Sequence, residues 1–126
     1  MELISAIATA PGRGGVAIIR ISGEGALELA AKMFPRKDFA PNVLYPGRID
    51  CGAFGDFGMC VYFRAPHSFT GEDVVEFHCH GGAEIARGVL KKTLELGARQ
   101  AEPGEFTRRA YLNGKLSLSA VEGMCE

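Results

Sequence analysis

The residues from Gly71 to Gly82 constrain the fold most strongly, because they combine a strand pattern, a cluster of titratable side chains and a helix start. In an extended strand, successive side chains point to opposite faces. One set here is apolar and the other titratable, namely Val75, Phe77 and Cys79 against Glu76, His78 and His80. A carboxylate and two imidazoles are costly to bury unpaired. We therefore predict that the apolar face packs in the core and that the titratable face borders a cleft, a partner or solvent.

The bulk composition is that of an ordinary single globular domain. The chain has 126 residues, of which 47% are hydrophobic and 23% charged, and this length is sufficient to bury a core without disulfides or metals. Its 14 basic and 15 acidic residues leave a net charge of −1. This balance argues against a domain that holds nucleic acid mainly by neutralising phosphates.

The cysteines indicate a reducing compartment. Cys51, Cys60, Cys79 and Cys125 form no Cys-x-x-Cys pair, and their spacing does not suggest the disulfide framework of a secreted domain. No apolar run has the length of a membrane span, and the N-terminus lacks a signal-peptide pattern. The sequence predicts a cytoplasmic protein with reduced thiols and no association with membranes.

Two apolar runs, residues 3–9 and 16–21, flank a glycine-rich loop near the N-terminus. The loop lacks the Gly-Lys-Ser/Thr ending of a nucleotide-binding loop, and a strand rather than a helix follows it. We therefore expect two neighbouring strands joined by a tight connection that exposes Arg13. On the second strand, Arg20 alternates with isoleucines and so lies on the polar side.

Helical spacing of apolar residues predicts a helix over 24–34, with Leu27, Ala30, Ala31 and Phe34 buried and Pro35 closing it. A strand is expected over 59–63, and a weaker strand pattern covers 48–54.

The last third of the chain predicts a second amphipathic helix after Gly82, with Gly97 as its C-terminal glycine. Its apolar stripe is Ala86, Val89, Leu90, Thr93 and Leu94. A short strand over 98–101 and a short helix bearing two arginines should follow, and then a turn that presents Lys115. Ser119 to Glu122 has the spacing of a capping box, which should open another helix in a longer protein. The alternation of strands and helices predicts an α+β or α/β sandwich with a mixed sheet.

Three kinds of chemistry fit the polar residues. His78 and His80 could ligate zinc together with Cys60, His67 or Glu76, yet Cys79 points to the opposite face and the ligand set stays incomplete. Glu76 with a neighbouring histidine suits acid–base catalysis, although no Gly-x-Ser-x-Gly nucleophile is present.

The third interpretation is a cleft for a polar heteroaromatic ligand with an acidic tail. Glu76 can accept two hydrogen bonds from an amidine-like ring edge such as that of a pterin, while Arg20 and Lys115 can hold carboxylates. Each residue also has a purely structural interpretation: Glu76 can pair with a histidine or arginine across the sheet, Arg20 can be a surface charge, and Lys115 can be a solvated turn residue. The residues by themselves leave these alternatives open.

Several long motifs, taken together and in order, resemble the N-terminal domain of the MnmE family, also called TrmE. They are ATAPGRGGV from residue 8, IIRISG from 18, FTGEDVVE from 69, HCHGG from 78 and EPGEFTRRAYLNGKL from 102.

The resemblance implies a fold, a ligand and partners. The fold would be α+β, a mixed sheet with two to three helices like the folate-binding domain of the glycine-cleavage T protein. The domain would form a homodimer and bind a tetrahydrofolate derivative, formyl- or methylene-tetrahydrofolate, through Arg20, Glu76 and Lys115. The whole protein would be a GTPase that modifies the wobble uridine of tRNA together with the flavin-dependent partner MnmG, or GidA.

The resemblance also implies domain limits. Residues 1–116 would form the folate-binding and dimerisation domain, and residues 117–126 would begin a helical domain. GTP, magnesium and potassium would bind in a G domain outside this chain, which has no Walker A motif, and Cys125 stands in the wrong context to replace the family's C-terminal cysteine motif. The chain would thus contribute binding rather than catalysis. The rival hypotheses are a purely structural dimerisation module that binds no folate and, from another class, a small metal- or histidine-dependent enzyme.

Overall fold

The structure, a computed structural model, describes residues 2–9 and 15–116. The expectations for Arg13, for a helix opening at Ser119, for Cys125 and for the segment 117–126 concern positions outside the described residues.

The described residues form one six-stranded mixed sheet and three helices. The strands are β1 (Ile4–Ile7), β2 (Ala17–Ser22), β3 (Tyr45–Asp50), β4 (Gly55–Phe63), β5 (Val74–Cys79) and β6 (Arg99–Gln100), and the helices are α1 (Ala26–Ala31), α2 (Gly82–Glu95) and α3 (Glu105–Leu112). The strand order is β3-β4-β5-β2-β1-β6, and every pair is antiparallel except β1 with β6. The predicted α+β class with a mixed sheet is confirmed.

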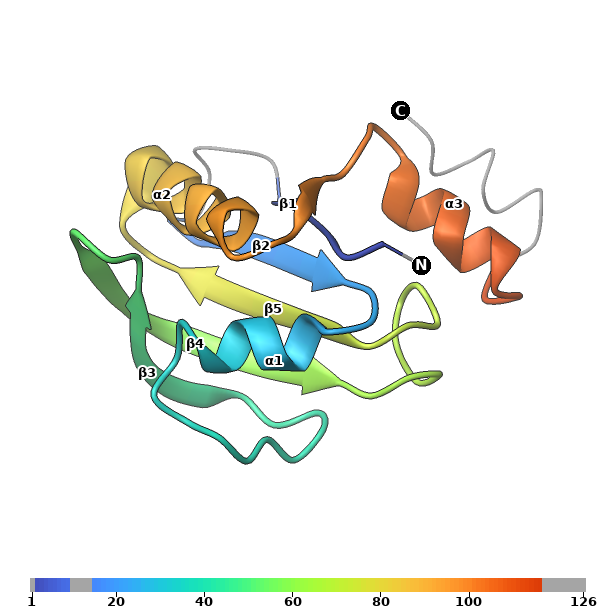
Figure 1. The fold of residues 1–126 in the computed structure, drawn as a ribbon, viewed down its shortest axis with the longest axis horizontal. Helices are drawn as coiled ribbons and strands as arrows, with labels where there is room; N and C mark the ends of the chain where they lie inside the picture. Colours follow the sequence, from blue (N-terminus) through green and yellow to red (C-terminus); the bar gives the residue numbers. More distant parts are fainter. Residues whose placement is uncertain (1, 10–14, 117–126) are drawn as a thin grey trace.

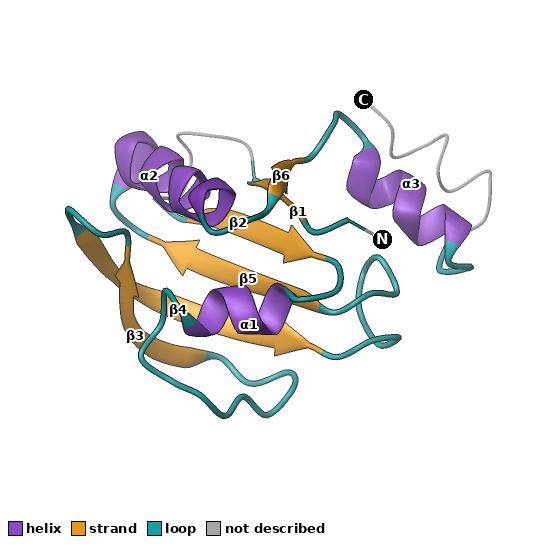
Figure 2. Cartoon of the chain, in the orientation of Figure 1, coloured by secondary structure: helices purple, strands orange, loops and turns teal. Residues whose placement is uncertain are grey.

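Two helices cover one face of the sheet. Helix α1 packs against β5, and α2 lies across β1 and β2 on the same side (Figure 1). Helix α3 follows the short edge strand β6 and lies away from the other two helices, as Figure 2 shows. On the opposite face of the sheet, Phe106 of α3 and Phe69 of the loop before β5 lie against Arg20 of β2.

The core lies between this sheet and the two covering helices. Ile19 pairs with Phe77, Ile21 pairs with Val75, and all four side chains are fully buried. The helices cover them with small and branched side chains, namely Ala26, Leu29 and Ala30 from α1 and Ala86 and Val89 from α2. Apolar burial of this kind is the main favourable contribution to folding. The alternation predicted for residues 74–80 thus sets which face of β5 enters the core.

Helix α1 is shorter than its apolar pattern predicts. It begins after Gly25, whose φ of 94° suits glycine, and it ends at Ala31, four residues before Pro35. Ala30 and Phe34 are buried as expected, but Ala31 is exposed and Leu27 only half-buried. Phe34 stays in the core because its amide still donates to the Ala30 carbonyl in a tight turn (3.0 Å).

Strand β3 begins and ends earlier than the predicted strand over 48–54. Asp50 ends it, because its carboxylate accepts the backbone N–H of Gly52 at 2.9 Å and Gly52 adopts a φ of 91°. This turn returns the chain into β4, which begins at Gly55 rather than at residue 59. A short turn therefore lies within the expected strand, between Asp50 and Gly55.

Replacing Phe77 by Ala should destabilise the protein by about 3–5 kcal/mol, because a large buried side chain leaves a cavity. Phe57 is the matched control, since it lies on the neighbouring strand β4 with 69% of its surface exposed. Its replacement by Ala should change stability by less than about 0.5 kcal/mol. Urea unfolding of both variants measures the difference, and equal effects would contradict this description of the core.

Candidate functional site

The polar face of β5 carries the predicted cluster. Glu76 and His78 are half-buried on the side away from the core residue Phe77, as the alternation predicts. His80 lies just beyond the end of β5, where its backbone N–H donates to Asp56 at 3.0 Å. The alternation of the strand therefore applies to Glu76 and His78 but no longer fixes the direction of His80.

Glu76 is paired through both carboxylate oxygens. The antiparallel register places Arg20 of β2 directly opposite Glu76, and Arg20 Nε donates to Glu76 Oε2 at 3.0 Å. The other oxygen, Oε1, lies 3.1 Å from His78 Nε2. The three side chains retain 13–24% of their exposed surface. The cluster is thus half-buried and accessible.

These contacts keep Glu76 ionised. Burial by itself would raise the pKa of Glu76, but the hydrogen bonds and charges of His78 and Arg20 outweigh it and lower the pKa below its ordinary value. At neutral pH the carboxylate is therefore a hydrogen-bond acceptor. This state suits the recognition of a donor-rich ring edge, whereas a general acid would need a raised pKa.

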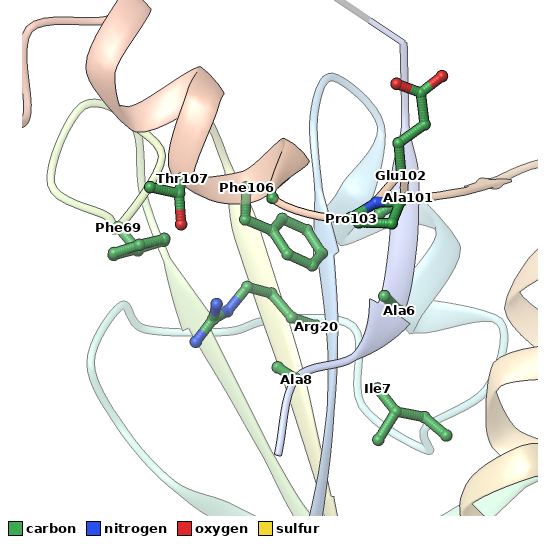
Figure 3. A pocket seen from close by; sticks show the side chains of 11 residues that line it. Ala6, Ile7, Ala8, Arg20, Phe69, Ala101, Glu102, Pro103, Phe106 and Thr107 are labelled. Atoms are coloured by element: carbon green, nitrogen blue, oxygen red, sulfur yellow. The ribbon is translucent and has the colours of Figure 1, made fainter. Parts of the chain in front are cut away.

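Two phenyl rings hold the guanidinium of Arg20. Its Cζ lies 5.0 Å from the ring centroid of Phe69, in the loop before β5, and 5.4 Å from that of Phe106, in α3. Both distances are within the range of cation–π attraction. In the view of Figure 3 the guanidinium lies below the two rings, and Thr107 lies above it, near Phe69.

A cavity of about 580 Å³ opens beside this arrangement. Its wall is formed by Ala6, Ile7 and Ala8 of β1 and the residues after it, by Arg20 and Phe69, and by Ala101, Glu102, Pro103, Gly104, Phe106 and Thr107 at the start of α3. The volume is typical of a small-molecule site, and the wall combines apolar side chains with polar ones, namely Arg20, Glu102 and Thr107. Arg20 is the positively charged side chain in this wall.

A chain of ion pairs holds α3 at the cavity. Arg109 donates through Nη1 to Glu72 Oε1 at 3.0 Å and to the backbone carbonyl of Glu2 at 2.7 Å. Its Nη2 lies 3.4 Å from Glu105 Oε2, and Glu105 in turn accepts two hydrogen bonds from Arg99 at 2.8 and 3.1 Å. Buried charges of this kind require partners, so the network fixes α3 against β6, the N-terminus and the loop before β5.

Lys115 lies at a different place from the other two predicted binding residues. Its Nζ donates to the backbone carbonyl of Pro66 at 3.1 Å. The loop fits closely here, because a Cβ on Gly71 would lie 2.9 Å from Asn113 and 3.4 Å from the Lys115 side chain. The structure thus pairs Arg20 with Glu76, and it places Lys115 against Pro66 and Gly71 of the loop that carries Phe69.

Sequence reasoning did not find the side chains that surround Arg20. Phe69 and Phe106 are ordinary aromatic residues in a loop and a short helix, and no local pattern marks them as neighbours. Glu105 and Arg109 carried a signal, since oppositely charged residues four apart face each other on a helix. Their partner Glu72 is 37 residues from Arg109 and had no such signal.

The candidate metal ligands do not converge in the described part of the chain. There, no group of three His, Cys, Asp or Glu side chains could hold an ion. Cys60 and Cys79 are buried on the core side, where burial raises the pKa of each thiol to about 12, while Glu76 and His78 lie on the other face. These two cysteines are unpaired and unreactive.

Among the described residues no helix is long and apolar enough to cross a bilayer.

Comparison with known proteins places the chain in one family. Residues 3–115 match the family model described as GTP-binding protein TrmE N-terminus. The tRNA modification GTPase MnmE of Thiobacillus denitrificans is 50% identical over 126 residues, which cover 99% of this chain and 28% of that protein. The proteins of the same name from Laribacter hongkongensis and Nitratiruptor are 50% and 48% identical, with 99% and 98% of this chain and 28% of each relative covered. The chain thus spans less than a third of the length of these relatives.

The ion pairs around Glu105 predict a loss of stability in acid. Hydrogen bonds from Arg99 lower the pKa of Glu105 from 4.5 to about 2, so the folded state binds fewer protons than the unfolded state between these values. The stabilisation is complete above about pH 4.5 and is lost as the pH falls towards 2; at most it amounts to about 3 kcal/mol.

Glu105→Gln should therefore be less stable than the parent at pH 7, and the difference should shrink towards pH 2. Urea unfolding at pH 7, 4 and 3 measures it, with the exposed Glu102→Gln as the control. Parallel pH profiles for the parent and Glu105→Gln would show that the ion pairs contribute nothing.

Proposed function

This chain belongs to the family of the GTP-binding protein TrmE N-terminus, and on that premise we propose that it is the tetrahydrofolate-binding and homodimerisation domain of a tRNA-modifying GTPase. In this proposal residues 1–116 form that domain and residues 117–126 begin a helical domain. The ligand is a tetrahydrofolate derivative that carries a one-carbon unit, formyl- or methylene-tetrahydrofolate.

The observation that carries the proposal is the ionised Glu76 paired with Arg20 beside a cavity of about 580 Å³. A carboxylate can accept two hydrogen bonds from the amidine-like edge of a pterin ring. Arg20 can donate to a carboxylate of the acid tail through its terminal nitrogens. A ligand that carries both a donor-rich ring and carboxylates therefore offers a partner to each member of the pair.

Ligand binding would rearrange the contacts of Glu76. Both oxygens already have partners, Arg20 Nε and His78 Nε2. A ring edge that donates twice would share Oε2 with Arg20 and replace His78 at Oε1. The His78 side chain keeps 24% of its surface exposed, so water can replace Glu76 as its hydrogen-bond partner. The function of these residues is to bind and orient the ligand, and catalysis would take place elsewhere.

Lys115 would take the outer part of the acid tail. Its contact with the Pro66 carbonyl is exposed, and exposed contacts contribute little to stability. A long flexible lysine can leave such a contact and reach a carboxylate at the edge of the site. In this proposal Arg20 and Lys115 engage different carboxylates or different positions of one tail.

The remaining activities are assigned outside this chain. The relatives named tRNA modification GTPase MnmE are more than three times as long as the matched region, and the sequence here has no Walker A motif. We assign GTP, magnesium and potassium to a G domain, and the wobble uridine of tRNA and the flavin-dependent MnmG, or GidA, to the whole protein. The free thiols of Cys51, Cys60 and Cys79 agree with a cytoplasmic location.

A second candidate is a dimerisation domain that binds no folate. The observation that favours it is that Glu76 is already satisfied by residues of its own chain. Under this hypothesis the Arg20–Glu76–His78 cluster only joins β2 to β5.

Calorimetric titration with formyl-tetrahydrofolate separates the two functions. Binding should saturate, and Glu76→Ala should weaken it at least about tenfold, because each hydrogen bond to a charged group contributes about 1.5–3 kcal/mol. Glu28→Ala is the matched control, since Glu28 is an exposed carboxylate on α1. Light scattering on the same samples should give the mass of a dimer for all three proteins. A folded dimer that gives no heat at several temperatures would leave only the assembly function.

Replacing Lys115 by Ala should weaken folate binding about three- to tenfold at low salt, and the loss should shrink as salt is added, because exposed charges are screened. Titrations at about 20 and 300 mM salt measure the change. The matched control is Lys91→Ala, on the exposed side of α2. An equal loss in both variants would show that only the net charge matters.

A further inference from the structure

The guanidinium of Arg20 is fixed on several sides before any ligand is bound. Glu76 holds Nε at 3.0 Å, and the rings of Phe69 and Phe106 lie at 5.0 and 5.4 Å from Cζ. Among the contacts of the described residues, only Nε of the three guanidinium nitrogens is in a hydrogen bond. The terminal nitrogens are therefore the donors that remain for a ligand in the adjoining cavity.

Fixing this side chain matters because arginine is flexible. A free arginine loses much rotamer entropy when it binds, and a pre-oriented fork loses less. The attraction between the cation and a ring face does not use the N–H groups of the guanidinium as hydrogen-bond donors. These groups therefore stay available to a ligand. Two rings and one carboxylate thus hold the plane of the fork and leave its outer edge open.

The two rings come from segments that meet only in the folded chain. Phe69 precedes Glu72 by three residues in the loop, and Phe106 precedes Arg109 by three residues on α3. Residues three apart on a helix lie on the same face, so the ion pair between Arg109 and Glu72, at 3.0 Å, joins the same two segments that supply the rings. This pair therefore sets the gap that Arg20 occupies.

We propose that Phe69 and Phe106 are positioning residues that hold Arg20 as a pre-oriented fork for a carboxylate bound in the cavity, with the Arg109–Glu72 ion pair fixing the distance between the rings. This inference rests on the proposed function, of which it names the part of the ligand and the residues that act through Arg20. Neither phenylalanine needs to touch the ligand's carboxylate for this role.

Leucine substitutions test the role, since leucine is nearly as large but has no ring face. Phe106→Leu and, independently, Phe69→Leu should weaken binding of formyl-tetrahydrofolate about three- to tenfold. Phe57→Leu is the matched control, because this exposed aromatic lies on β4 and pairs with Arg48 of β3. Unfolding midpoints in urea identify any variant whose fold has changed.

A double-mutant cycle separates positioning from a general structural effect. In an Arg20→Ala background, Phe106→Leu should change affinity by less than about twofold, since its effect acts through Arg20. A persistent three- to tenfold loss in that background would overturn the proposal. Unchanged affinity of both leucine variants in the parent background would also overturn it while leaving the folate-binding function intact.

A second measurement does not depend on folate. The Arg20 Nε–H resonance, assigned by its loss in Arg20→Ala, should shift saturably when the chain is titrated with sodium glutarate, a simple dicarboxylate. Phe106→Leu and Phe69→Leu should require about three- to tenfold more glutarate, and Phe57→Leu should behave as the parent. If the parent binds no folate but shows this pattern, the proposed function fails and the fork is supported. The absence of any glutarate shift in the parent would overturn the fork itself.

Discussion

The antiparallel register between β2 and β5 is the constraint on which the rest of the structure depends. It pairs Ile19 with Phe77 and Ile21 with Val75 on one face, and it therefore places Arg20 against Glu76 on the other. A shift by one residue would turn the apolar set outward and bury the charges. The burial of the core and the geometry of the site are thus consequences of the same pairing, and neither can change without the other.

The site is completed by a segment that the sheet does not contain. Helix α3 has no place in the main core, and it is held instead by Arg109, Glu105, Arg99 and Glu72. Buried ion pairs are a weak source of net stability but break at high cost when one partner is removed. Their contribution here is to fix the position of α3, so that Phe106 reaches Arg20 and the cavity has its second wall.

The local patterns of the sequence were sufficient where the interactions are local or periodic. The alternation through Phe77 and Glu76 gave the two faces of β5 correctly, and the spacing of Ala86, Val89 and Thr93 gave the buried side of α2. The patterns failed where a single tertiary contact decides the outcome, as at Asp50, whose capping of Gly52 ends β3 early. Lys115 was grouped with Arg20 and Glu76 from family motifs; in the fold its Nζ contacts the Pro66 carbonyl, in the loop that carries Phe69, and its part in binding stays a prediction.

The sequence by itself determined the class of the fold, the family, and the nature of the charged groups, because periodicity and motif order are properties of neighbouring residues. Only the tertiary structure decided that Glu76 would bind Arg20 Nε and that the rings of Phe69 and Phe106 would lie against the guanidinium. These four residues are separated by up to 86 positions in the chain, and no local preference of the backbone relates them. Strand pairing brings Arg20 and Glu76 together. The ion pairs of α3 bring Phe106 to them, because charges removed from water require partners.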